Sequence, residues 1–341
     1  MSGPAEYTCE SVAGREANHY SPAPYGPTMG QRRVVSMTSD STLCGWRIRS
    51  EWPLPELLPW TGDDRVPDIS IRLGEVPECL PGNPQGGPVC QVNEEGLVRY
   101  AIRDVAAYLI REGKEIVIAT RLPHGAPDVG LFLLGSVFGI VCHQRGVLPL
   151  HASCIAFGDR AVAFAGVSGS GKSTIAAALL ALGGLLVSDD VTVVDIRAEG
   201  GPMALPSFPR QKLWRDTLDA LAIPPGRPLR SIVDLQKFER PVADRFRTEP
   251  VRLAMICHLR PSVIRNAMDT EKLRGAKALK FLQNNIYRYR VAELLDLSSR
   301  QFIHVGKLAA SVPQQRLFVG NELHQLLDAM VGLPSALGLV S

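Results

Sequence analysis

A glycine-rich run near the middle of the 341-residue chain has the pattern of a phosphate-binding loop. Residues 166–173 read GVSGSGKS and fit GxxxxGK followed by Ser or Thr. Glycines allow backbone N–H groups to turn inward around an anion, and a helix after the loop adds the positive end of its dipole. We expect Lys172 to reach the β- and γ-phosphates of a nucleotide and the Ser173 hydroxyl to bind Mg²⁺. The residues expected to bind the nucleotide are Gly166, Ser168, Gly169, Ser170, Gly171, Lys172, Ser173 and Thr174.

Two adjacent acids, Asp189 and Asp190, follow the apolar stretch LLVS at residues 185–188. A strand that ends in acids presents them at the ligand edge of a parallel sheet. One carboxylate of such a pair can hold Mg²⁺ while the other accepts the proton of an attacking hydroxyl. The other interpretation is a turn at the end of the strand, in which Asp190 only caps the chain.

A predicted hairpin brings His151 to the same loop. The apolar strands ASCIAF and RAVAFA are separated by Gly158-Asp159, a two-residue turn signal with glycine first. Across such a turn the numbers of paired residues sum to 317, so His151 faces Gly166. From there the imidazole could contact the transferred group or tune the proton affinity of an acid. An ordinary structural histidine is the alternative.

The elements around these residues predict two domains behind an extension. Residues 1–36 are polar and have no apolar period, so we expect them to be disordered. Residues 37–145 contain the strand-like segments GWRIRSEW, DISIRL, VRYAIR and EIVIAT and an apolar helix over 129–142, which predicts a β-rich N-terminal domain. Residues 146–341 begin with strand, glycine loop, helix and strand, the order of an α/β unit. The segment 271–295 has helical periodicity.

The stretch LHASCIAFGDRAVAFAGVSGSGKSTIAAALLALGGLLVSDDVTVVD resembles the catalytic domain of the HPr kinase/phosphorylase family. In that family a histidine precedes a short hairpin, a P-loop follows, and a strand ends in an Asp pair. The resemblance implies an α/β catalytic domain with a P-loop fold related to phosphoenolpyruvate carboxykinase. It also implies catalytic roles for Asp189, His151 and Lys172, with Asp189 as the base that activates a serine hydroxyl. Asp190 would assist Mg²⁺, so the implied cofactors are ATP and Mg²⁺.

The resemblance fades beyond these residues. The glycine- and arginine-containing signature that follows the Asp pair in HPr kinases is absent, and ALPSFPRQKLW stands there instead. This segment and WRIRSEWPLPELLPW look more like the HPr-kinase-related proteins found with ribosomal peptide clusters, some of which phosphorylate a serine of a lasso-peptide precursor. The resemblance thus implies an ATP-dependent serine kinase acting on a small peptide or protein. The alternatives are HPr kinase/phosphorylase proper, a P-loop ATPase or GTPase, and a nucleotide-sensing partner without a phosphoacceptor.

Basic residues gather in the second half of the chain. Residues 205–290 contain 18 Lys and Arg against 8 Asp and Glu, although the net charge of the whole chain is only +3. Such a region suits phosphates or an acidic peptide, and a solvated basic surface is the alternative. No aromatic-rich or zinc-type module accompanies it, so we expect no nucleic acid. The candidate contacts to the γ-phosphate or the acceptor are Arg210, Lys212, Arg288 and Arg290.

Cysteine usage and hydropathy indicate a cytoplasmic protein. The seven cysteines have no CxxC spacing, which favours reduced thiols over a disulfide framework or a zinc site. The N-terminus lacks the order of a signal peptide. The longest apolar run, residues 129–142, is too short to cross a bilayer, so we expect no membrane. The sequence leaves a homo-oligomer open.

Overall fold

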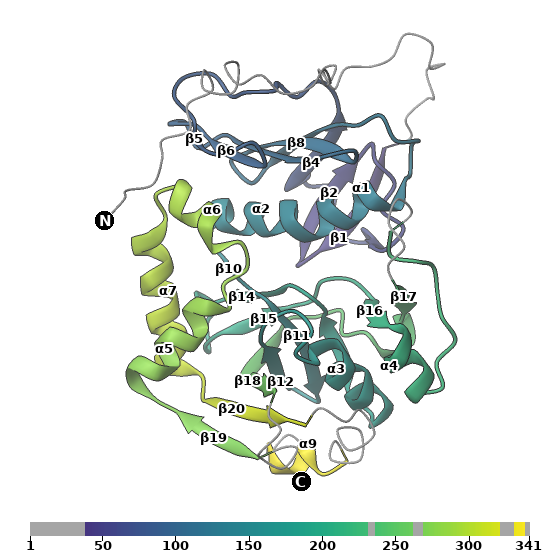
Figure 1. Cartoon of the computed structure of the whole chain (residues 1–341), viewed down its shortest axis with the longest axis vertical. Coiled ribbons are helices and arrows are strands. Elements are labelled where there is room, and N and C mark those ends of the chain that lie inside the picture. Colours follow the sequence, from purple (N-terminus) through teal and green to yellow (C-terminus); the bar gives the residue numbers. More distant parts are fainter. Residues whose placement is uncertain (1–37, 231–235, 262–268, 321–330, 338–341) are drawn as a thin grey trace, which may run out of the picture.

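The computed structural model describes residues 38–230, 236–261, 269–320 and 331–337. The extension predicted to be disordered, residues 1–36, lies outside them. The described part is mixed α/β structure, with two large sheets, a two-stranded hairpin and a long helix between the two sheets (Figure 1).

The first sheet comes from residues 39–119. In the described part of the chain its strands follow the order β3-β1-β2-β4-β9-β8-β7-β6-β5. Their bounds are β1 Ser39–Leu43, β2 Trp46–Ser50, β3 Leu58–Pro59, β4 Ile69–Leu73, β5 Gln85–Gly86, β6 Cys90–Val92, β7 Val98–Ile102, β8 Ala106–Arg111 and β9 Glu115–Ala119. Parallel pairing joins β2 to β4 and β4 to β9, and the other neighbours are antiparallel. The four strand-like segments read from the sequence coincide with β2, β4, β7 and β9.

One continuous helical stretch covers this sheet and contains the predicted helix 129–142. It consists of α1 Pro127–Phe132, the π-helical η2 Leu133–Val137 and α2 Phe138–Arg145. By length and composition it could cross a membrane, but 78% of its most apolar window is buried inside the protein, as in a core helix. Its buried side chains share one apolar cluster with the first sheet and with Val191, Phe208 and Val291. The helix therefore packs the two halves of the chain together.

The second sheet begins at residue 148 and carries the glycine loop. Its strands follow the order β10-β14-β15-β18-β12-β11-β13 within the described residues, and β20 pairs with β18 and β19 off this path. Their bounds are β10 Leu148–Leu150, β11 Ala152–Phe157, β12 Arg160–Ala165, β13 Leu185–Ser188, β14 Thr192–Asp195, β15 Met203–Leu205, β18 Val251–Pro261, β19 Thr270–Leu273 and β20 Gln314–Val319. The strands β12, β18 and β20 run parallel.

The predicted hairpin is present with the predicted register. Ala152 lies opposite Ala165 and Phe157 opposite Arg160, so the paired numbers sum to 317, and Gly158 in the turn has φ 58°. Because β11 is antiparallel to both β12 and β13, the ends of those two strands meet the start of β11 at one edge of the sheet. The ends of β18 and β20 lie at the same edge, since both run parallel to β12.

The remaining elements include those that cover this edge, α3, β16, β17 and α4. The bounds of these four and of the other elements are α3 Lys172–Ala181, the hairpin β16 Arg210–Trp214 and β17 Lys237–Pro241, α4 Arg215–Ala220, η3 Ala243–Arg245, α5 Gly275–Asn284, α6 Tyr289–Leu294, α7 Ser298–Ser311 and α9 Leu333–Ala336. The helical prediction for 271–295 is right only in part. Its first residues belong to β19, whose pairing with β20 overrides the local periodicity. The helix also breaks between α5 and α6, where Arg288 takes a left-handed φ of 54°.

The prediction of reduced thiols holds for five cysteines and is wrong for one. Cys44, Cys90, Cys142, Cys154 and Cys257 are free. Cys79 is disulfide-bonded. Spacing along the chain cannot reveal such a bond, because pairing depends on which segments meet in space.

Two buried histidines are held neutral by matched hydrogen bonds. Nε2 of His258 lies 2.9 Å from Oε1 of Gln314, and its Nδ1 lies 3.3 Å from the amide nitrogen of Asn285. In His143, Nε2 lies 2.8 Å from the carbonyl oxygen of Tyr287, and Nδ1 lies 3.1 Å from the side-chain amide nitrogen of Gln301. In each ring Nε2 must donate and Nδ1 must accept, so a second proton has no acceptor. Burial lowers the pKa of each imidazole to about 4.

These histidines predict a loss of stability in mild acid. The unfolded chain takes up protons near pH 6.5 while the folded chain does not, so the free energy of unfolding falls as the pH drops from about 7 toward 4. Each histidine accounts for roughly 2 kcal/mol by pH 5. His258→Gln, which keeps one donor and one acceptor, should remove its share. Urea unfolding of wild type, His258→Gln and His143→Gln at pH 7 and pH 5 tests this, and equal pH dependence in all three would contradict it.

Candidate active site

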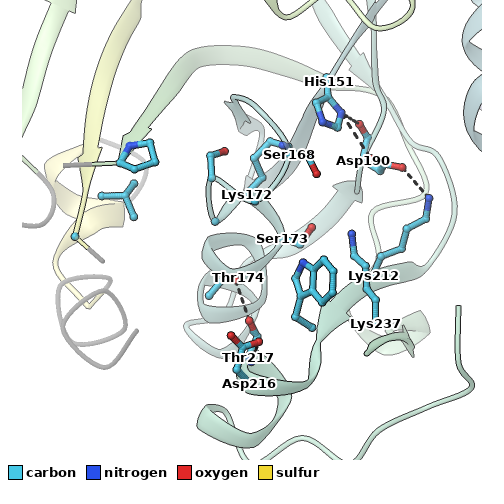
Figure 2. A pocket seen from close by; sticks show the side chains of 17 residues that line it. His151, Ser168, Lys172, Ser173, Thr174, Asp190, Lys212, Asp216, Thr217 and Lys237 are labelled. Carbon is cyan, nitrogen blue, oxygen red and sulfur yellow. Dashed lines mark hydrogen bonds and ion pairs between the residues drawn. The ribbon is translucent and has the colours of Figure 1, made fainter. Parts of the chain in front are cut away.

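The glycine loop connects β12 to α3 and forms one wall of a cavity of about 470 Å³ (Figure 2). Gly169 and Gly171 adopt φ values of 81° and 92°, which favour glycine. A Cβ atom at Gly166 would lie 2.7 Å from Oγ of Ser170, so a side chain there would force Ser170 to shift. Among the described residues nothing satisfies the buried Oγ of Ser170. The loop therefore has the curvature and an unused hydroxyl donor that an anion would require.

Lys172, the first residue of α3, folds back over this loop. Its Nζ donates to the carbonyl oxygens of Gly166 at 2.8 Å and Val167 at 2.9 Å, and the residue is only 7% exposed. Burial lowers the pKa of the ammonium, and the carboxylates of Asp190 and Asp189 oppose that shift. The cation is thus held at the mouth of the loop, where an anion cradled by the backbone N–H groups would meet it.

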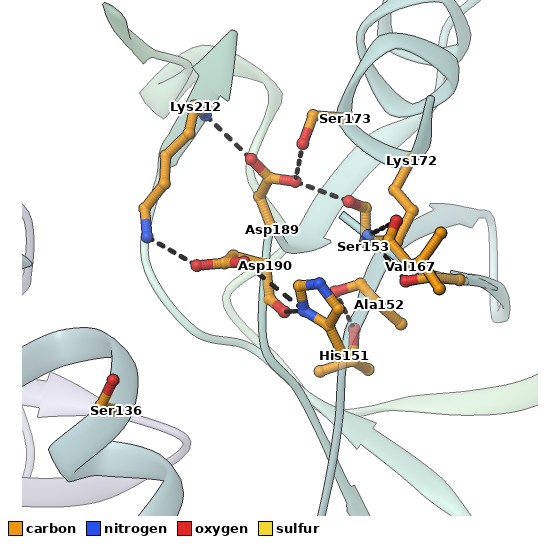
Figure 3. A network of polar contacts seen from close by, with 12 residues as sticks. Ser136, His151, Ala152, Ser153, Val167, Lys172, Ser173, Asp189, Asp190 and Lys212 are labelled. Carbon is orange, nitrogen blue, oxygen red and sulfur yellow. Dashed lines mark hydrogen bonds and ion pairs between the residues drawn. The ribbon is translucent and has the colours of Figure 1, made fainter. Parts of the chain in front are cut away.

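Asp189 is buried just after the end of β13, and its carboxylate accepts three hydrogen bonds (Figure 3). Oδ1 accepts the hydroxyls of Ser153 at 2.6 Å and Ser173 at 2.9 Å, and Oδ2 accepts the backbone N–H of Lys212 at 2.8 Å. A serine hydroxyl and a carboxylate in contact are the hard oxygen ligands that Mg²⁺ prefers. The geometry therefore joins Asp189, rather than Asp190, to the serine expected to bind metal.

Asp190 lines the cavity and has a different environment. Its backbone takes a left-handed φ of 74°, which aspartate tolerates better than most residues. One carboxylate oxygen lies 2.7 Å from Nζ of Lys212, and the other lies 3.6 Å from Nδ1 of His151. Burial alone would raise the pKa of this carboxyl, but Lys212, with smaller contributions from His151 and Lys237, holds it well below its usual value. Asp190 is therefore ionised and faces the space in front of the loop.

His151 stands on the cavity wall beside Asp190. Its Nδ1 lies 3.0 Å from the carbonyl oxygen of Asp190, and because a carbonyl can only accept, Nδ1 carries the hydrogen. Burial lowers the pKa of this imidazole, and the nearby ammonium of Lys172 lowers it further. The ring is therefore neutral at pH 7, with Nε2 as an acceptor. Its backbone N–H donates to the carbonyl oxygen of Asn285 at 2.7 Å, which fixes the residue from behind.

The structure separates the four basic candidates. Lys212 lines the cavity, whereas Arg210 is buried between Glu56 and Glu239 and does not line it. Arg288 and Arg290 line a different cavity, which His151 also borders. The expectation that Arg210 grips a phosphate is thus not supported, because both of its bonded carboxylates are buried with it.

Sequence reasoning missed several residues of the cavity. Lys237 pairs with Trp214 across the β16–β17 hairpin, and its Nζ lies 5.5 Å from the indole ring centre. Thr217 contacts the loop helix, since its Oγ1 lies 3.1 Å from Oγ1 of Thr174. The further lining residues are Asp216, Pro261, Val319 and Gly320. The segment RQKLW has no apolar–polar alternation, so the sequence did not reveal the hairpin whose partner strand places Lys237 here.

The donor set fits a metal ion that shares its ligands with a nucleotide. Within the described residues, no group of three or more His, Cys, Asp or Glu side chains could hold a metal by itself. Mg²⁺ at phosphate sites needs only one or two carboxylates or hydroxyls, because phosphate oxygens and waters complete its shell. Ser173 and Asp189 supply such a pair.

Comparisons with known proteins give a distant likeness of fold. No family model and no curated protein matches the chain. Among solved structures, the chain is similar to the HPr(Ser) kinase/phosphatase from Coxiella burnetii at 11% sequence identity, with a TM-score of 0.29. The match covers 56% of this chain and 92% of that chain. A likeness of this size says nothing about activity.

The buried cluster around Arg210 predicts a structural role. Arg210→Met would leave the carboxylate of Glu56 buried without a cation, which should reduce the free energy of unfolding by about 3–5 kcal/mol. Arg227, which also pairs with Glu239, has a side chain 66% exposed, so Arg227→Met should cost less than about 1 kcal/mol. Urea unfolding measures both. ATP affinity of folded Arg210→Met should match that of wild type, and a selective loss of affinity would return Arg210 to the phosphate site.

Proposed function

We propose that this chain is an ATP-dependent phosphotransferase that moves the γ-phosphate to a serine hydroxyl of a small peptide or protein. One observation carries the proposal. A single cavity has the glycine loop, Lys172 and Ser173 on one side and Asp190, His151 and Lys212 on the other. The first set suits a triphosphate, and the second set suits an attacking hydroxyl. The Asp pair and the histidine also match the motif that resembles HPr kinases.

We assign the two acids to roles opposite to those that the resemblance implied. Asp189 accepts the hydroxyl of Ser173 together with two further hydrogen bonds and does not line the cavity, so we assign it to the metal alongside Ser173. Asp190 lines the cavity and is ionised, so it is the proton acceptor. Magnesium bound with the nucleotide would neutralise charge on the β- and γ-phosphates.

The transfer then balances as follows. The serine oxygen forms a bond to the γ-phosphorus, and the bond from that phosphorus to the β–γ bridging oxygen breaks. The electron pair leaves with ADP, and the serine proton passes to the carboxylate of Asp190. Lys172, Lys212 and Lys237 provide positive charge for the transferring group.

The ion pair between Lys212 and Asp190 couples nucleotide binding to the base. A γ-phosphate in the cavity competes with the carboxylate for the same ammonium. Weakening that pair removes the main interaction that lowers the pKa of Asp190, so its pKa rises toward a value better suited to accepting a proton. The carboxylate becomes a stronger base when the phosphoryl donor is present.

The proposed acceptor is a peptide serine. A serine of a ribosomal peptide precursor, including a lasso-peptide precursor, follows from the sequence resemblance. HPr kinase/phosphorylase proper is a second candidate with the same donor chemistry. A P-loop ATPase would use water in place of the hydroxyl and would release free phosphate.

Label transfer separates these candidates. With γ-³²P-labelled ATP and serine-containing peptides, label should appear on peptide serine, and Lys172→Ala should weaken ATP binding about tenfold or more because a charge-assisted contact is lost. The exposed Lys114→Ala is the matched control and should bind ATP like wild type. Free phosphate without labelled peptide would indicate an ATPase. Unchanged ATP affinity in Lys172→Ala would refute the nucleotide site.

Substitution of Asp189 and of Asp190 should have different effects on binding and transfer. Asp190→Asn keeps the left-handed backbone and should lower kcat by about 10²- to 10⁴-fold with little change in ATP affinity. Asp189→Asn replaces one carboxylate oxygen with an NH₂ group, which then faces donors instead of acceptors. The substitution should therefore weaken Mg·ATP binding and reduce stability. The exposed Asp219→Asn on α4 serves as control. Normal Mg·ATP binding with lost transfer in Asp189→Asn, together with active Asp190→Asn, would restore the assignment implied by the resemblance.

A further inference from the structure

A second cavity, of about 1280 Å³, shares His151 with the nucleotide cavity. One of its walls comes from Gly86 to Cys90 at the β5–β6 end of the first sheet, and the other from residues 284–294 around α6. Figure 1 shows α6 between that end of the first sheet and the second sheet. We call this cavity the interdomain groove. It opens from the flank of the candidate active site.

Backbone pairing fixes the wall that separates the groove from the nucleotide cavity. Leu150 forms a bridge with Ile286, and the backbone N–H of Tyr287 donates to the carbonyl oxygen of Pro149 at 2.9 Å. The ring of Tyr287 lies 5.6 Å from the ring of His151. A Cβ at Gly139 of α2 would lie 2.6 Å from the Tyr287 ring, so the helix makes room for it. The imidazole is therefore held at the boundary of both cavities.

The groove combines an apolar lining with two arginines, Arg288 and Arg290, and one exposed acid, Glu293. Its apolar lining includes Val89, which is 52% exposed, Ile286 and Leu294. Arg288 donates to Oγ of Ser136 in the π-helical segment and stacks on two tyrosine rings. Arg290 is exposed and, within the described residues, makes no ion pair. An apolar surface with an uncommitted guanidinium suits an apolar chain that carries a carboxylate.

We propose that the interdomain groove binds the acceptor peptide in an extended form, with apolar side chains on Val89 and Leu294 and a carboxylate on Arg290. The proposal rests on the proposed phosphotransferase function and deepens it. The groove exceeds the roughly 300–1,000 Å³ of small-molecule pockets, which favours a peptide. A serine at the His151 end of that peptide enters the nucleotide cavity beside Asp190. The carboxylate comes from an acidic side chain or from the peptide's C-terminus.

Transfer kinetics with defined peptides test the groove. The probes are short peptides with one serine flanked by leucines. The first carries an acidic side chain, and the second has a free C-terminus next to the serine. The third carries a lysine and an amidated C-terminus in their place. Arg290→Gln should raise KM for the carboxylate peptides about tenfold, with kcat and the KM for ATP unchanged. Arg290→Glu should invert the preference toward the lysine peptide. Val89→Glu should raise KM for all leucine-flanked peptides that carry a carboxylate.

Arg103→Gln is the matched control, because Arg103 is exposed on the turn between β7 and β8 and does not line the groove. The two carboxylate peptides are compared in Arg290→Gln, and the one that loses more affinity shows whether Arg290 binds an acidic side chain or the C-terminus. Equal kinetics for wild type, Arg290→Gln and Val89→Glu would overturn the groove while leaving the phosphotransferase intact. A change in oligomeric state in Arg290→Glu by light scattering, without a change in peptide KM, would also overturn it and indicate a self-interface.

Fluorescence anisotropy of the same peptides, labelled at the end away from the serine, separates the two proposals. Peptide binding that weakens in Arg290→Gln, without label transfer by the wild type, would refute the phosphotransferase and support the groove. Label transfer by the wild type, with peptide binding that is unchanged in Arg290→Gln, would support the phosphotransferase and refute the groove. Absence of both binding and transfer for all of these peptides would overturn both proposals.

Discussion

The candidate site depends on the buried carboxylate of Asp189. It accepts hydrogen bonds from Ser153 on β11, Ser173 on α3 and the backbone of Lys212 on β16, so one side chain joins three segments to the end of β13. Burying a charge is costly unless donors surround it, and three donors surround this carboxylate. The glycine loop, the hairpin β16–β17 and the histidine strand therefore keep fixed positions relative to one another. The neighbouring acid remains available for chemistry because Asp189 provides this structural link.

The sheet supplies the second constraint. A single antiparallel strand, β11, lies between two strands that run parallel to each other, β12 and β13. Without it, only strand ends would meet at the ligand edge. With it, the residue just before β11 also lies there, which is why His151 stands near the loop and beside the acids. The start of β11 and the ends of β12 and β13 therefore bring their side chains around one small volume.

The parts of the site that depend on short spacing could be predicted, and the parts that depend on packing could not. The glycine loop and the hairpin register follow from a few consecutive residues, so the sequence predicted both. The assignment of the two acids depends on which one turns toward Ser173, and successive residues at a strand end point to opposite sides. Arg210 and Lys212 have the same parity on β16, yet Glu56 and Glu239 bury the first, while the second reaches Asp190. No local pattern distinguishes them, because the partners are far away in the chain.

The first sheet takes part in the proposed chemistry through the interdomain groove. Among the described residues, none of those that line the cavity at the glycine loop comes from this sheet, since that lining begins at His151. It does form a wall of the interdomain groove, and the helix packed on it gives Ser136 to Arg288 and leaves space at Gly139 for Tyr287. In the proposed transfer, the acceptor hydroxyl approaches the γ-phosphate from the side opposite the leaving group. In that proposal the interdomain groove gives the acceptor its own entrance, with the neutral imidazole of His151 at the junction of the two cavities.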